Sequence, residues 1–283
     1  MTAGANDITV SRESLLADSI AAFKTIQNPY KVLNVTFQNE VSRDVGGVSR
    51  EFFTTLMQEV LNENFGLFST ANTEQFSYRV AVDSYEIGGF EELFHFFGKL
   101  LGKAMFDRIP LNLCLNTAIF NALLGKVSPE DYADTKSYNL VDINVAQSLK
   151  FITENDLTLY EDTMEFYFTT TRETNYAEVD LKPNGSNIKV TNANKAEFAR
   201  LKRHYHAYEA VKKQLEQIRK GFYEVIRPEW VSFLTTDELE SFMCGLQTID
   251  LSDWKQHTET RGFNNFIKSM TLYRFWHILG TYD

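Results

Sequence analysis

The sequence is poor in cysteine, has no long apolar run and carries no excess of positive charge. Its two cysteines, Cys114 and Cys244, are too few for a disulfide scaffold in a chain of 283 residues, so we expect an intracellular, cytoplasmic or nuclear location. No apolar run approaches the roughly 20 residues that a membrane-spanning helix needs, so no membrane insertion is expected. The net charge is −10, which disfavours nucleic acid as a partner because its phosphates would be repelled.

The sequence also lacks the residue spacings that are typical of metal sites and of many active sites. It contains neither Cys-x-x-Cys nor His-Glu-x-x-His, and we expect no metal and no cofactor. Cys244 and His257 could form a nucleophile and its base, as in a Cys–His hydrolase. However, Cys244 ends an apolar helical pattern, and such a cysteine is usually a small buried residue. The residues taken alone therefore predict no catalytic site.

Aromatic residues are abundant, and they indicate a folded chain with a sizeable core. There are 23 Phe and 13 Tyr, and 43% of all residues are hydrophobic, which argues against disorder. Apolar residues at helical spacing predict the main helices, at about residues 12–26, 48–62, 90–106, 113–124, 141–153, 193–219 and 267–279. A further helix is predicted to begin at Thr235 or Thr236, and a short one at residues 251–254. Short strands are predicted at residues 30–37, 164–168 and 188–191. The predicted fold class is therefore α+β and mostly helical.

Several motifs follow one another along the chain. Two of them carry glycines: Asp44-Val45-Gly46-Gly47 leads into Arg50-Glu51-Phe52-Phe53, and Gly98 to Ala104 reads Gly-Lys-x-x-Gly-Lys-Ala. Gly98 and Gly102 lie four residues apart on one predicted helix, which predicts close packing against another helix. The full set, in order, is NVTFQNEVSRDVGGVSREFF, FGLF, FHFFGKLLGKAMFDRIPLNLCLNTAIFNALLG, SLKFITEND, DLKPNGSNIKVTNANKAEF, IRKGFYEVI, DELESFMCGLQTIDLSDWKQHTE and LYRFWHIL. Each motif alone is modest, but their order and spacing together are specific.

In this order the motifs resemble the amino-terminal lobe (N-lobe) of a HECT-type ubiquitin ligase, over about residues 8–283. The resemblance implies a bilobed arrangement: an N-terminal extension at 1–10, a large helical subdomain at 11–144 and 220–283, and a smaller inserted subdomain at 145–219. In this family ubiquitin passes by transthiolation from a ubiquitin-conjugating enzyme to a cysteine in a carboxy-terminal lobe, and then to substrate lysines. That lobe follows the Phe275-Trp276 helix in the family, so we expect this chain alone, ending at Asp283, to be inactive.

The resemblance also implies that the smaller subdomain binds the conjugating enzyme in an apolar groove. The matching residues are Val145, Ser148, Leu149, Ile152, Met164, Phe166, Phe198 and Lys202. Phe198 stands in a Lys-x-x-Phe position and is the expected anchor, whereas Lys202 replaces the aromatic or aliphatic residue that is frequent in the family. The strand register around 158–168 leaves Phe168 as an alternative to Phe166.

Two further possibilities stay open. Phe65 is a candidate contact for a second ubiquitin, by analogy with some members of the family. A non-catalytic helical scaffold with a HECT-like lobe is the alternative function, and Lys202 is the residue that favours it.

Overall fold

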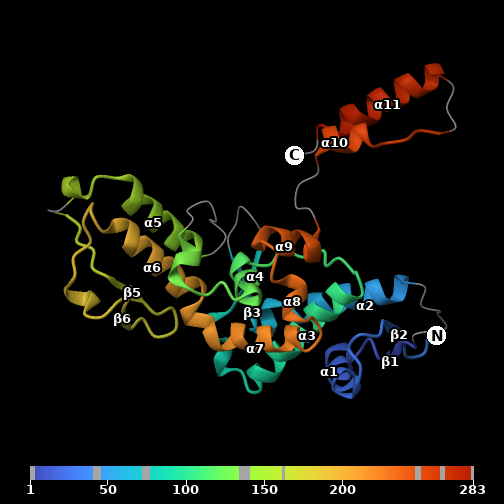
Figure 1. Ribbon diagram of the computed structural model, residues 1–283, viewed down its shortest axis with the longest axis horizontal. Coiled ribbons are helices and arrows are strands. Elements are labelled where there is room, and N and C mark those ends of the chain that lie inside the picture. Colours follow the sequence, from blue (N-terminus) through green and yellow to red (C-terminus); the bar gives the residue numbers. More distant parts are fainter. Residues whose placement is uncertain are drawn as a thin grey trace. The chain divides into compact units, whose positions relative to one another are not determined.

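The computed structural model describes residues 4–40, 46–71, 77–133, 141–160, 163–245, 250–261 and 265–281. The chain divides into two compact units, Met1–Gly245 and Leu246–Asp283. The fold is α+β and mostly helical, as predicted, and the described residues form three two-stranded sheets (Figure 1). None of the helices in these ranges is long and apolar enough to cross a membrane.

The first unit begins with a β–α–β arrangement. Strand β1 (Asn6–Val10) pairs in parallel with β2 (Leu33–Phe37), and α1 (Leu15–Thr25) connects them. Leu33, Val35 and Phe37 are buried at alternate positions of β2, as the sequence predicts for a strand with one covered face. Strand β1 was not predicted, because only Ile8 and Val10 mark it as apolar.

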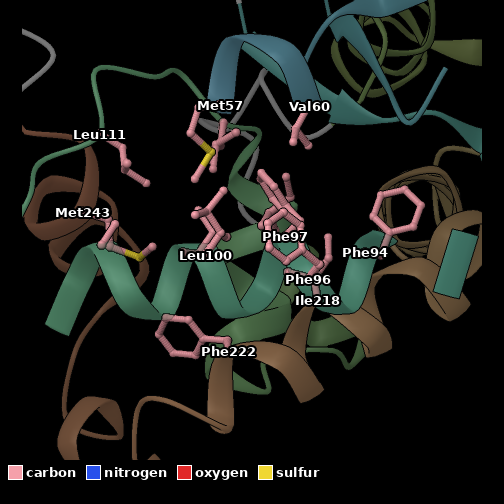
Figure 2. Packing of buried hydrophobic residues seen from close by; sticks show 14 of the residues in the cluster. Met57, Val60, Phe94, Phe96, Phe97, Leu100, Leu111, Ile218, Phe222 and Met243 are labelled. Carbon is pink, nitrogen blue, oxygen red and sulfur yellow. The ribbon is translucent and has the colours of Figure 1, made fainter. Parts of the chain in front are cut away.

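The core of this unit is built on two closely packed helices, α3 (Phe90–Phe106) and α7 (Lys212–Tyr223). A Cβ added at Gly98 would lie 1.9 Å from the Ile218 carbonyl oxygen, and one at Gly221 would lie 1.9 Å from the His95 carbonyl oxygen. The glycines therefore let the two backbones approach, which confirms the close packing predicted for Gly98. Figure 2 shows the buried side chains around α3, among them Phe94, Phe97, Leu100, Ile218 and Phe222.

Several further elements of this unit contribute residues to the main core. They are α2 (Gly47–Val60), η1 (Glu63–Phe65), β3 (Phe68–Ala71) antiparallel to β4 (Ser77–Val80), η2 (Val82–Glu86), α4 (Thr117–Leu124), η3 (Pro129–Tyr132), α8 (Pro228–Val231) and α9 (Thr236–Cys244). The predicted start of α9 is confirmed by a capping box, in which Thr235 and Glu238 satisfy each other's backbone N–H groups.

A second hydrophobic cluster lies on α5 (Ile143–Glu154), η5 (Leu157–Tyr160), β5 (Thr169–Thr171), β6 (Glu178–Asp180), η6 (Gly185–Asn187) and α6 (Lys195–Ala207). The strands predicted at 164–168 and 188–191 are wrong: these residues share only an isolated bridge, between Tyr167 and Lys189. The Phe168 N–H donates to the carbonyls of Gly185 and Ile188 at the η6 turn, and this turn prevents a regular ladder.

The single helix predicted at 193–219 is also wrong. The chain leaves helical geometry at Tyr208 (φ −130°, ψ −60°), passes through η7 (Glu209–Val211) and begins α7 at Lys212. Tyr208 and Val211 are both buried in the main core. The break allows α6 to pack in the second cluster while α7 packs in the main core. Helical periodicity alone does not predict such a break.

The second unit contains α10 (Leu251–Gln256) and α11 (Asn265–Leu279), close to the helices predicted there. The Trp254 ring lies 5.5 Å from the Trp276 ring and 6.0 Å from the Phe275 ring. These aromatic contacts join α10 to α11 within the unit.

Candidate partner-binding site

The second cluster has a core in which α5 and α6 lie side by side (Figure 1). Its buried members include Leu149 and Ile152 from α5 and Phe198 from α6, with Phe168 between the elements. The rings of Phe168 and Phe198 meet edge to face with their centroids 5.6 Å apart. This geometry is favourable for aromatic pairs and fixes both rings.

Polar contacts determine where the elements of the cluster begin and how they join. The Asp142 carboxylate caps α5 by accepting the Asn144 N–H at 2.9 Å. Asn192, just before α6, accepts the Leu157 N–H at 3.0 Å, and Lys195 donates to the Asn155 carbonyl at 2.6 Å. The start of α6 is thereby tied to the end of α5.

The eight residues predicted to bind the conjugating enzyme differ in their exposure. Leu149, Ile152 and Phe198 are buried, and the expected anchor Phe198 is only 1% exposed. Val145 and Phe166 pack against the same cluster and are partly exposed, as are Ser148 and Lys202. Met164 is 48% exposed. Phe198 thus offers almost no contact area in this conformation. Phe168, the alternative to Phe166 in the sequence analysis, is fully buried.

Lys202 covers part of this cluster. Its ammonium lies 5.4 Å from the centroid of the Phe198 ring, one helical turn away on α6. Burial lowers the pKa of this ammonium, because a charged group loses hydration there. A second lysine, Lys182, lies 3.8 Å from the Phe168 centroid but is paired with Glu197 at 2.9 Å.

Three exposed apolar side chains around this cluster were missed in the sequence. Leu159 is 77% exposed, and Tyr167 and Tyr176 are also exposed. Their sequence signal is weak, because they lie in turns and short loops where no periodicity separates an inward from an outward side. Leu159, Met164 and Tyr176 are the most exposed of the apolar side chains on these segments.

Side chains of α6 and of the β5–β6 loop connect the cluster to the rest of the first unit. Arg203 donates to the Tyr132 carbonyl at 2.7 Å, and a ring nitrogen of His204 lies 2.9 Å from the Val127 carbonyl. The Glu173 carboxylate lies 3.2 Å from Arg79 on β4 and 3.4 Å from His206. The arrangement holds the second cluster against β4 and η3.

Neither cysteine has the surroundings of a nucleophile. Burial raises the pKa of the Cys244 thiol to about 12, and it raises the pKa of Cys114 as well. Both are therefore protonated thiols near neutral pH, and a thiol is a far weaker nucleophile than a thiolate. Phe65, the other predicted contact, lies at the end of η1 and packs partly buried against the main core.

Comparison with known proteins identifies the family. The family model for the HECT domain, described as ubiquitin-transferase, matches residues 54–283. The chain is 31% identical over 279 residues to E3 ubiquitin-protein ligase HUWE1 of Mus musculus, 31% over 281 residues to RSP5 of Chaetomium thermophilum, and 30% over 283 residues to ptr1 of Schizosaccharomyces pombe. The chain belongs to the HECT-domain family of ubiquitin transferases. Each alignment covers 98% of this chain but only 6%, 33% and 8%, respectively, of these relatives.

Proposed function

We propose that this chain is the N-lobe of a HECT-type E3 ubiquitin ligase and that residues 145–219 dock a ubiquitin-conjugating enzyme. Residues 11–144 and 220–283 then form the larger subdomain. The observation that carries the proposal is the second hydrophobic cluster, which is separate from the main core and is bordered by accessible apolar side chains such as Met164 and Leu159. Apolar side chains with a polar surround are typical of protein-binding surfaces.

In this proposal the buried and the accessible residues have different roles. Leu149, Ile152 and Phe198 fix the shape of the surface from below, whereas Met164, Phe166, Val145 and Ser148 supply contact area. Rigid support beneath a binding surface lowers the entropy that is lost when a partner binds. Phe198 as a direct contact remains a prediction, because it requires the surface to open.

The docked enzyme would transfer ubiquitin to a cysteine other than Cys114 and Cys244, whose partly buried thiols have raised pKa values and are poor nucleophiles. The lobe itself would contribute proximity, since holding two reactants in place removes much of the entropic barrier to their reaction. Phe65 as a contact for a second ubiquitin stays a prediction. The transfer of ubiquitin to substrate lysines likewise belongs to this proposal for the whole ligase.

The test is the affinity of the chain for a panel of ubiquitin-conjugating enzymes. We expect Met164→Asp to weaken binding of the best partner by about tenfold, since it puts a charge into an apolar contact. Phe233→Asp is the matched control, because Phe233 is 76% exposed and lies beyond α8, outside the cluster. Met164 is preferable to Phe198 as a probe, because truncating a buried ring would also unfold its surroundings.

The non-catalytic scaffold is the second candidate, and the burial of Phe198 beneath Lys202 favours it. The same panel separates the two functions. A scaffold without a docking role would bind none of the enzymes, and Met164→Asp would then change nothing.

A further inference from the structure

Four cationic side chains project from α6, and they differ in how they are satisfied. Lys195 donates to the Asn155 carbonyl, Arg200 pairs with Glu130 at 2.5 Å, and Arg203 donates to the Tyr132 carbonyl. Within the described ranges Lys202 has neither a hydrogen bond nor an ion pair, and its one contact of this kind is with the Phe198 ring. Lys202 is thus the unsatisfied cation of this helix.

The position of Lys202 makes this lack of a partner consequential. The side chain is partly buried, and its ammonium has lost hydration without gaining an acceptor in return. A carboxylate brought to this point by another protein would gain a charge-assisted hydrogen bond with an ammonium that is already partly desolvated. An apolar side chain there would instead leave the ammonium buried and unpaired.

We infer that Lys202 is a specificity-determining residue, which selects conjugating enzymes that bring an Asp or Glu side chain to the α6 side of the docking surface. This inference rests on the proposed docking function. It adds to it a chemical requirement on the partner: apolar contact near Met164 together with one carboxylate at Lys202. Electrostatic complementarity of this kind contributes chiefly to the choice among related partners.

The experiment measures dissociation constants of the wild-type chain for a panel of conjugating enzymes with and without an acidic residue on the ligase-facing surface. We expect Lys202→Glu to weaken binding of acidic-faced enzymes by roughly tenfold or more, through repulsion. Lys202→Met keeps a stem over Phe198 and removes the charge, so it should weaken acidic-faced enzymes and spare the others. Lys213→Glu on α7 makes the same change of charge at an exposed position and is the control.

A reciprocal change of charge on the partner is the decisive experiment for the role of Lys202. Replacing the responsible carboxylate of the bound enzyme by Lys should restore its affinity for Lys202→Glu, and added salt should weaken the wild-type complex more than the Lys202→Met complex. If enzymes bind but Lys202→Glu behaves like Lys213→Glu, the inference about Lys202 is overturned and docking stands. If no enzyme binds the wild-type chain, the docking function fails, and the inference fails with it.

Discussion

Glu173 joins three elements of the first unit through one carboxylate. It lies in the loop between β5 and β6, and it contacts Arg79 on β4 and His206 on α6. The hydrogen bond from His206, followed by the charge of Arg79, holds the pKa of this carboxyl below its ordinary value of 4.5. His206 is in turn held by Thr170, whose hydroxyl lies 2.8 Å from its second ring nitrogen.

Because the folded-state pKa is depressed, Glu173 stabilises the fold above pH 4.5, and this contribution is lost as the pH falls through the lowered folded-state value. We expect Glu173→Gln to lower the free energy of unfolding by about 1 kcal/mol at pH 7, a value reduced for partial exposure. Urea unfolding at pH 7 and at about pH 3 measures the difference, which should be smaller at the lower pH. Glu216→Gln, an exposed change on α7, is the control; an equal loss for Glu173→Gln at both pH values would contradict the assigned role.

At the scale of elements, local patterns predicted most helices but not the division of the chain between two clusters. The helix at Phe90–Phe106 matches its prediction at both ends, because glycine begins it and its apolar face is continuous. The break at Tyr208 could not be predicted, since no Pro or Gly marks it and the apolar spacing continues. It follows from long-range packing, in which α6 and α7 serve different cores.

The candidate site was predictable only in part, for the same reason. The resemblance placed Leu149, Ile152 and Phe198 in one neighbourhood, and the structure brings these three together. How deeply these side chains are buried was not predictable, because their exposure depends on Lys202 and on the turn that buries Phe168. Leu159 carried no usable signal, since its exposure arises from the short η5 turn.

The α3–α7 contact gives a prediction at this scale. Gly221→Ala should lower the free energy of unfolding by about 2 kcal/mol or more, because the new Cβ would collide with the His95 carbonyl and separate the helices. Gly47→Ala is the control: a Cβ there meets nothing within 4 Å, and alanine is a better helix former. Urea unfolding midpoints measure both variants. If Gly221→Ala proved as mild as Gly47→Ala, the close packing of α3 and α7 would be disproved.

At the scale of the whole molecule, the two hydrophobic clusters have different proposed roles. The main core supports α3 and α7, and the second cluster is fastened to it by Arg203, His204 and Glu173. Under the proposed docking function, a surface held in this way would present a bound conjugating enzyme in a defined orientation, which is what transfer by proximity requires. Under the proposed docking function, the affinity of this chain for particular conjugating enzymes would depend on a few partly exposed residues such as Met164 and Lys202.

Amide hydrogen exchange of the chain, alone and saturated with a conjugating enzyme that binds it, tests the proposed docking role of the second cluster most directly. Binding should slow amide exchange in Ile143–Glu154, around Met164 and in Lys195–Ala207. The exchange rates in α3 and α7 should stay the same. Protection confined to α3, α7 or α2, with none on α5 and α6, would contradict the docking role of the second cluster.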